Sequence, residues 1–321
     1  MAFPGPSLRS WGPVARFEAG LDIRRASRQA TCTGGRASTL AGQGRPGRGL
    51  LLLRRTSLSF RTGALLVACF LVVAVAAPLL APYAPDQVLA GPRLAPPSPA
   101  HLFGADSLGR DMFSRVVHGA GIAVQAAAMG MGLSALLGIP LGLLAGYRGG
   151  WWDRLLSRFM DLWLAFPGML LALVIVARLG PSLQNAIIAI GALSAPGFYR
   201  LTRSLTLSTC QLAYVESAEA VGCCERRVLW RHVLPNLASS LVVFATMRAG
   251  TAILAVGGLS FLGLGAQPPT PEWGALLAAG RSHMDTAPWL AVYPGLSLTA
   301  VVIGLNLLGD GLRDLWDHRS C

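Results

Sequence analysis

The stretch "GALLVACFLVVAVAAPLLAPY", residues 63–83, contains no charged residue, and nearly all of its side chains are apolar. An α-helix rises about 1.5 Å per residue, so about 20 apolar residues cross a hydrocarbon core of about 30 Å. The stretch therefore predicts a helix that spans a membrane once. It lacks the small-residue cleavage context of a signal peptide and its apolar run is too long for one, so we expect a retained anchor.

The composition of the whole chain agrees with a membrane location. Of the 321 residues 53% are hydrophobic and only 13% are charged, whereas soluble domains carry about 25% charged residues. The formal net charge is +12, and every basic residue is an arginine. Nucleic-acid-binding proteins can be equally basic but are not this apolar, so we expect no nucleic-acid partner. The six cysteines show neither a CxxC spacing nor a secreted disulfide pattern, and we interpret them as reduced or structurally incidental.

Five further segments have the length and composition of membrane helices, which gives six predicted spans. Their glycines and prolines are ordinary in membrane helices, where neighbouring helices satisfy the freed backbone groups. The predicted segments are residues 116–147, 159–177, 182–199, 237–264 and 287–309. The weakest of them is 182–199, because it contains Gln184, Asn185 and Pro196.

The arginine distribution predicts the orientation of these spans. Arginine-rich segments alternate along the chain with segments in which acids offset the arginines. The arginine-rich segments are 1–61, 148–158, 200–236 and 311–321, and the balanced ones are 86–115 and 265–286. Since an arginine excess marks cytoplasmic loops, both termini are expected in the cytoplasm of a multi-pass inner-membrane protein.

The chain divides on this basis into four parts. Residues 1–61 contain eleven arginines and only Glu18 and Asp22 as acids, and this composition predicts a disordered cytoplasmic tail. A transit peptide and a start codon assigned too far upstream remain alternatives for this tail. The other predicted parts are an anchor helix with an extracytoplasmic loop (62–115), a transmembrane domain (116–310) with a cytoplasmic loop (204–236), and a cytoplasmic tail (311–321).

A charged loop interrupts the apolar pattern at "YVESAEAVGCCERRVLWRHVLPN", residues 214–236. The residues up to Gly222 favour a short helix that ends in a left-handed glycine. A second short helix is expected to end near Pro235, which suits the first turn of the following span. The alternative is a solvated connector, but helix–helix connections in bundles are mostly shorter than this one.

This loop resembles the EAA signature of ABC-importer permeases. The matching residues are Glu216, Ser217, Ala218, Gly222, Leu234 and Pro235. Ser217 stands where the signature has alanine, and its small size leads us to expect that the contact is kept.

Three other segments resemble the dipeptide/oligopeptide/nickel permease family, in its C-type subunit. They are "HLFGADSLGRDMFSRVVHGA" (101–120), "LSFLGLGAQPPTPEWGALLAAGR" (259–281) and "NLLGDGLRD" (306–314). The resemblance extends over about residues 55–317. It implies an all-α fold with one anchor helix and a five-helix type I importer core.

The resemblance also implies a function and a set of partners. The protein would be a non-catalytic permease subunit that forms half of a translocation pathway, and the loop would dock on a cytoplasmic ATPase. Its partners would be a homologous second permease, two ATPase subunits, an extracytoplasmic binding protein and membrane lipid. ATP would be bound by the ATPase subunits, so no cofactor is expected in this chain. Di- and oligopeptides are the leading substrates, and nickel or another small solute remains the alternative.

Two positions depart from the expected pattern. Many relatives carry an acid near the position of Val256. Arg248 lies about twelve residues into the fifth span, where an arginine costs about 2.5–3.5 kcal/mol on insertion scales. It is expected either to line the pore and meet a substrate carboxylate, or to pair with an acid of the partner permease. Both interpretations remain open.

Two other classes of function fit the sequence less well. A proton-coupled transporter needs ionisable groups deep in the membrane, but Asp161 and Asp310 are expected near cytoplasmic ends. A membrane enzyme would carry a catalytic motif, and we find no GxSxG, HExxH or P-loop sequence. The histidines at 118, 232 and 283 are scattered over both sides and form no ligand set.

Overall fold

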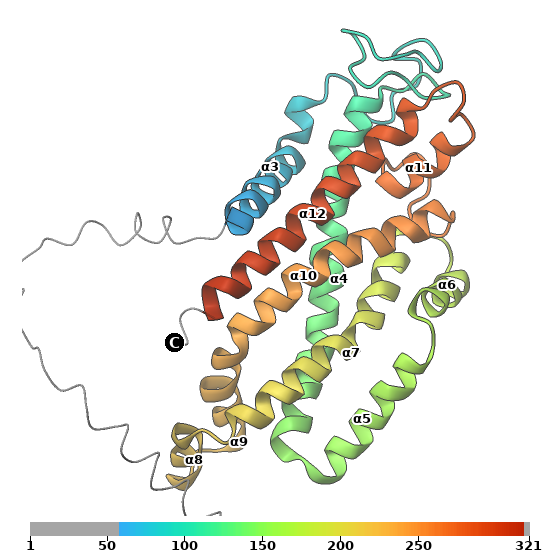
Figure 1. Cartoon of the computed structure of the whole chain (residues 1–321). Coiled ribbons are helices and arrows are strands. Elements are labelled where there is room, and N and C mark those ends of the chain that lie inside the picture. Colours follow the sequence, from blue (N-terminus) through green and yellow to red (C-terminus); the bar gives the residue numbers. More distant parts are fainter. Residues whose placement is uncertain (1–57, 318–321) are drawn as a thin grey trace, which may run out of the picture. The chain divides into compact units, whose positions relative to one another are not determined.

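The computed structural model describes residues 58–317, and within this range the chain is α-helical and contains no strand (Figure 1). The elements are α3 (Leu58–Leu80), α4 (Met112–Arg148), α5 (Gly150–Ala165), α6 (Gly168–Leu179), α7 (Leu183–Thr209), α8 (Ala213–Ala220), α9 (Glu225–Arg227), the π-helical turn η2 (Val228–Val233), α10 (Leu234–Phe261), α11 (Trp273–Arg281) and α12 (Trp289–Asp317). Most of the predicted N-terminal tail lies outside the described residues.

The number of long apolar helices agrees with a polytopic membrane protein. Within residues 58–317, four helical segments have the length and composition to cross a membrane: α3, α4, α12 and the continuous stretch from α9 to α10. The pair α5 and α6 raises the number to five if it is taken as one bent span. α7, the predicted weak span, is a helix of 27 residues that is not among these. The prediction of an all-α polytopic protein is confirmed.

The predicted span over residues 159–177 is bent in the structure. The chain breaks at Phe166 and Pro167, and the axes of α5 and α6 differ by 87°. Phe166 is extended, with φ −89° and ψ 140°, as expected for a residue that precedes proline. Proline also lacks the N–H that would continue the hydrogen bonds of α5.

Small residues at every fourth position of α4 allow α7 to approach closely. They are Gly130, Ser134, Gly138, Gly142 and Gly146. A β-carbon at Gly142 would lie 2.7 Å from the β-carbon of Thr202 in α7. The Ser134 hydroxyl donates to the carbonyl oxygen of Gly191 across the same interface, at 2.6 Å. α4 and α7 therefore form one tightly packed unit, which supports the idea that glycines in the spans serve helix packing.

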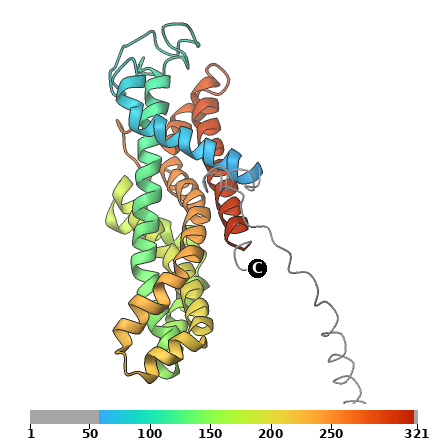
Figure 2. The ribbon, with the colours of Figure 1, turned by 90° about the vertical axis from the view of Figure 1, so that its left-hand side faces the viewer.

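The anchor helix α3 crosses α4 and α12 obliquely (Figure 2). Gly63 lies against the backbone of Leu307 and Leu308, and Gly311 of α12 lies against Phe60. These contacts extend beyond the predicted end of the last span at residue 309. The predicted C-terminal tail is accordingly helical as far as the end of α12, and its last four residues lie outside the described part of the chain.

The two ends of the helix bundle carry different structures (Figure 1). At one end, the loop between α3 and α4 folds onto the start of α4, where the Asp111 carboxylate accepts hydrogen bonds from the backbone N–H and the hydroxyl of Ser114. α11 lies at the same end, inside a segment for which no helix was predicted. The opposite end carries α8 and α9, the elements of the charged loop.

Candidate functional site

The charged loop forms a short helix, a glycine turn and a second helix. α8 ends at Ala220, and Gly222 has φ +87°, so the left-handed glycine expected from the sequence is confirmed. The sequence predicted a separate second helix, but α9, η2 and α10 follow one another without a break. The π-helical turn widens the helix directly before Pro235, which relieves the clash of the proline ring with the preceding turn.

One face of the loop packs against the transmembrane helices. Val215 of α8, Val228 and Val233 of η2 are fully buried. They belong to the same apolar cluster as Leu143 of α4, and the half-buried Tyr147 packs against this cluster. The loop is therefore seated on the end of α4 and does not hang free as a connector.

The opposite face of the loop is exposed and mixes charged and apolar groups. Glu216, Ser217 and Gly222 are exposed together with Pro235, whereas Ala218 and Leu234 are half-buried. The sequence interpretation overlooked three exposed apolar side chains here: Tyr214 at 45%, Val221 at 86% and Trp230 at 59% exposure. A shallow depression beside Trp230 is lined by Cys224, Arg226, Arg227 and Arg231. We call this face, from Tyr214 to Arg231, the loop surface.

The end of α4 contacts both arms of the loop. The guanidinium of Arg148 donates two hydrogen bonds to the carboxylate of Glu225 in α9, at 2.8 and 2.9 Å. The side chain of the neighbouring Tyr147 lies on the side of the Glu219 carboxylate in α8. These contacts were not predicted, since no local pattern links residues 77 positions apart.

Two further ion pairs join α5 to α7 at the same end of the bundle. Arg203 binds Asp153 through two hydrogen bonds, and Arg200 binds Asp161 at 2.8 Å. Asp161, which the sequence raised as an acid beside a span, is thus paired and exposed.

Arg248 lies on α10 beside α7. Its guanidinium carbon is 5.6 Å from the centre of the Phe244 ring, a cation–π arrangement. A β-carbon at Gly197 of α7 would lie 3.5 Å from a terminal nitrogen of Arg248. Its Nε atom is buried and has no hydrogen-bond partner within residues 58–317. Buried polar groups normally have partners, so this geometry is compatible with both interpretations of Arg248.

The position expected to carry an acid is apolar in this chain. Val256 is buried in α10. The buried carboxylate of Glu272 nevertheless approaches its neighbour Gly257, where a β-carbon would lie 3.6 Å from the Glu272 Oε1 atom. Its other oxygen accepts from the backbone N–H of Ala275 and caps α11. The Glu272 carboxylate, at the start of α11, thus lies beside α10 next to Val256, and the sequence did not indicate this.

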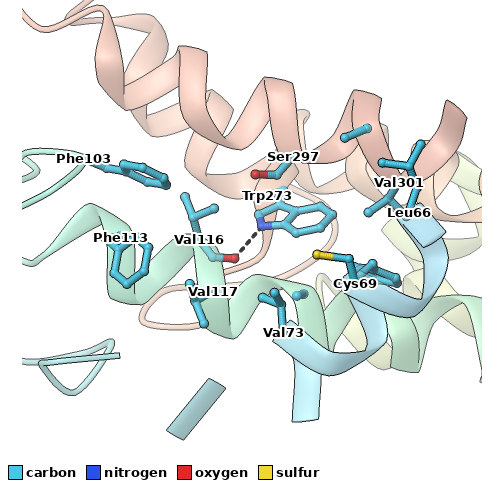
Figure 3. Close-up of a pocket in the computed structure, with 13 residues that line it drawn as sticks. Leu66, Cys69, Val73, Phe103, Phe113, Val116, Val117, Trp273, Ser297 and Val301 are labelled. Atoms are coloured by element: carbon cyan, nitrogen blue, oxygen red, sulfur yellow. Dashed lines mark hydrogen bonds between the residues drawn. The ribbon is translucent and has the colours of Figure 1, made fainter. Parts of the chain in front are cut away.

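An apolar cavity of about 320 Å³ lies among α3, α4, α11 and α12 (Figure 3). The indole N–H of Trp273 points across its wall and donates to the carbonyl oxygen of Val116, at 2.9 Å. The Ser297 hydroxyl donates to the Tyr293 carbonyl, so the polar groups that border this cavity are already satisfied. None of the predicted site residues lines it.

Four cysteines lie within the described residues, and none of them forms a disulfide. Cys224 of the loop is exposed, whereas Cys210, at the end of α7, is half-buried. Burial raises the pKa of the Cys210 thiol, and the nearby Glu219 carboxylate adds to the shift.

The family described as "Binding-protein-dependent transport system inner membrane component" matches residues 138–320. This chain is 50% identical over 259 residues to the glutathione transport system permease protein GsiD of Escherichia coli, which is 80% of this chain and 86% of the relative. The chain belongs to this family. It is also 44% identical over 257 residues to the dipeptide transport system permease protein DppC of Alkalihalophilus pseudofirmus, covering 80% of this permease and 84% of that protein.

A solved structure supports the fold of the permease. The helices superimpose on a chain of the MetNI methionine ABC transporter, solved in inward-facing conformations, with a TM-score of 0.53 and 18% sequence identity. The match covers 64% of this permease and 97% of the MetNI chain. The family match and the two relatives confirm the expected membership of an ABC-importer permease family. As a family member, the permease is one component of a multi-subunit transport system.

Proposed function

We propose that this permease forms half of the pathway of an ATP-driven importer of small peptides. It would pair with a homologous second permease, two cytoplasmic ATPase subunits and an extracytoplasmic binding protein. The names of its relatives, which transport glutathione and dipeptides, support the substrate class. The permease itself would supply positioning and motion, and the ATPase subunits would supply the chemistry.

The loop surface is the observation that carries this proposal. Val221 and Trp230 expose apolar side chains, and Trp230 lies beside three arginines. Glu216 is exposed in the same loop. Apolar groups bordered by charges are typical of protein interfaces, where aromatic residues and arginine are enriched. Since the other face of the loop is seated on α4, the exposed face is the side available to an ATPase.

The proposed orientation places the loop surface in the cytoplasm. α8 and α9 lie at one end of the bundle, and the loop before α4 lies at the other (Figure 1). The arginine-rich segments 148–158 and 200–236 both fall at the first of these ends. With the loop surface in the cytoplasm, we propose that both termini are cytoplasmic as well, as the arginine distribution favours.

Arg248 favours a substrate with a negative group over a bare metal cation. It holds a positive charge beside Gly197 and Phe244, with one N–H unpartnered within the described residues. A peptide carboxylate would supply the missing acceptor if this side chain reaches the pathway. An acid on the second permease would supply it otherwise.

Reconstitution of the complete transporter tests the proposal. The permease is purified with its second permease and ATPases, placed in liposomes and supplied with binding protein and radiolabelled dipeptide, glutathione or Ni²⁺. We expect ATP-dependent uptake of peptide, and uptake of Ni²⁺ alone would contradict the substrate class. Val221→Asp should weaken ATPase co-purification, whereas Ser107→Asp, an exposed change at the opposite end, should leave it intact.

A further inference from the structure

The loop has two arms, α8 before Gly222 and α9 after it, and neither arm directly follows α4 in the chain. α8 continues from α7 through residues 210–212, and α9 runs directly into η2 and α10. α4 reaches the loop only through side chains, and the polar ones are Tyr147 and Arg148. The first faces the arm before Gly222, and the second binds the arm after it.

These contacts close a ring around the Gly222 turn. α4 is packed along α7, α7 leads into α8, the turn leads into α9, and Glu225 of α9 returns to Arg148 at the end of α4. Gly222 itself has open space around its α-carbon, so no side chain fixes the angle of the turn. The polar contacts to α4 supplement the buried valines in holding the two arms together.

We propose that Arg148 and Glu225 form a clamp that fixes the angle between the two arms of the loop. The inference rests on the proposed function, because the clamp matters only when an ATPase pushes on the loop surface. With the clamp closed, the loop moves as one body and carries α4 together with α7 and α10. With it open, the turn at Gly222 flexes and absorbs part of the motion.

The geometry of the Arg148–Glu225 pair suits a role in orienting the two arms better than a role in stabilising the fold. Its side chains are 46% and 35% exposed, and exposed ion pairs contribute little to folding. Two parallel N–H···O bonds nevertheless fix the relative direction of a guanidinium and a carboxylate. Arg148 and Glu225 are therefore positioning residues, whose loss should change coupling more than it changes folding.

Charge exchange tests this clamp in the complete transporter. Arg148→Glu and Glu225→Arg are made singly and together, and Arg154→Glu serves as the control. Arg154 is an exposed arginine of α5 that, among residues 58–317, bonds to a backbone carbonyl of its own helix. The measurements are co-purification of the ATPase subunits, basal hydrolysis, and hydrolysis stimulated by peptide-loaded binding protein.

Each single exchange should lower the stimulation of hydrolysis about two- to fivefold, the range that the coupling energy of an exposed pair allows. ATPase co-purification and basal hydrolysis should stay near wild type, and the double exchange should restore stimulation. A double variant that remains uncoupled, or single variants that behave like Arg154→Glu, would overturn the clamp. Loss of co-purification in the single variants would also overturn it and would assign these residues to the ATPase interface.

If a charge reversal prevents membrane insertion, neutral variants of the same two residues test the clamp instead. Arg148→Gln, Glu225→Gln and the double variant form a cycle in which the clamp predicts non-additive losses of stimulation. Additive losses would reject the pair. A wild-type complex that binds no ATPase at all would instead reject the proposed function, and this outcome differs from every failure of the clamp.

Discussion

Gly142 of α4 and Thr202 of α7 lie so close together that a β-carbon at position 142 would be 2.7 Å from that of Thr202. It would also be 2.7 Å from the backbone oxygen of Tyr199, which cannot move without shifting α7. We expect Gly142→Ala to force the two helices apart at a cost of about 1–3 kcal/mol. Gly132→Ala is the matched control, because the space around Gly132 is open. Thermal unfolding in detergent should show a lower midpoint for the first variant only, and equal midpoints would contradict this packing.

The effect of a substitution at Gly222 should depend only on how well the new residue tolerates a left-handed backbone. Its φ of +87° is unfavourable for residues with a β-carbon, while no neighbouring atom would meet such a carbon. Gly222→Ala should cost about 1–2 kcal/mol in the turn, and Gly222→Asn less, since asparagine tolerates this region better. ATPase co-purification should therefore fall in the order glycine, asparagine, alanine, valine. Valine at wild-type level would show that the turn geometry is unimportant.

Glu216 provides a second test of the loop surface that leaves the turn unchanged. It is exposed on α8, and Glu216→Lys reverses its charge without burying anything. If it pairs with a cation of the ATPase, the reversal should weaken docking by about 2 kcal/mol or more, as with other interface charge pairs. Membrane insertion and association with the second permease should persist. Normal docking and normal stimulated hydrolysis in this variant would exclude Glu216 from the contact.

The orientation can be measured with reporters fused at the two ends of α10. The helical path from Glu225 to Phe261 contains 37 residues, which at about 1.5 Å per residue exceeds the thickness of a bilayer. A reporter active only outside the cytoplasm should be active at Pro268 and inactive at Cys223. A fusion at Ser107 should behave like the one at Pro268. The reverse pattern would overturn the orientation and, with it, the proposed ATPase contact.

Arg248 should be essential for transport under either of its interpretations. Removal of its charge by Arg248→Met should reduce peptide uptake about tenfold or more, the effect of losing a hydrogen bond to a charged group. If Arg248 contacts substrate, the four-subunit membrane complex should remain intact on gel filtration. If it pairs with the second permease, the two permeases should separate more readily. Full uptake by an intact complex would leave neither interpretation standing.

The cysteines of the loop should react with maleimide at different rates. The reactive species is the thiolate, and the raised pKa of Cys210 leaves less of it at pH 7–8 than an unshifted thiol would have. Cys210 should therefore label more slowly than the exposed Cys224, and the rate of Cys210 should still be rising at pH 8. Peptide mapping of the labelled permease by mass spectrometry measures both rates. Equal rates across this pH range would contradict the burial of Cys210.

Prolines show where prediction from the sequence succeeds and where it does not. Pro78, Pro140, Pro196 and Pro294 all lie inside continuous helices, whereas Pro167 separates α5 from α6. The uncharged runs around them look alike, because lipid exposure demands apolar residues in each case. Whether a helix bends at its proline depends on neighbours that are distant in the sequence. The membrane-spanning character was therefore predictable and the 87° bend was not.

The candidate site was predictable only where local backbone chemistry determined it. The left-handed turn at Gly222 follows from a glycine after a short helix, and the structure has it. The contacts of Arg148 with Glu225 depend on how α4 and the loop come together, and nothing near either residue indicates this. The motif "HLFGADSLGRD" proves to contain helix-capping and ion-pairing groups, such as Asp106 with Arg110. The residues of this motif therefore stabilise the loop at the end of the bundle where α4 begins.

The bend between α5 and α6 has a consequence for the way this protein enters the membrane. α6 has 12 residues and α5 has 16, so their lengths of about 18 and 24 Å both fall short of a hydrocarbon core of about 30 Å. The translocon cannot release either one into lipid as an independent span. Ala172 and Val176 of α6 are fully buried in the same cluster as Ala186 of α7. We therefore expect α5 and α6 to reach their final positions only after α7 has been synthesised. Their placement would then be a late step of membrane insertion.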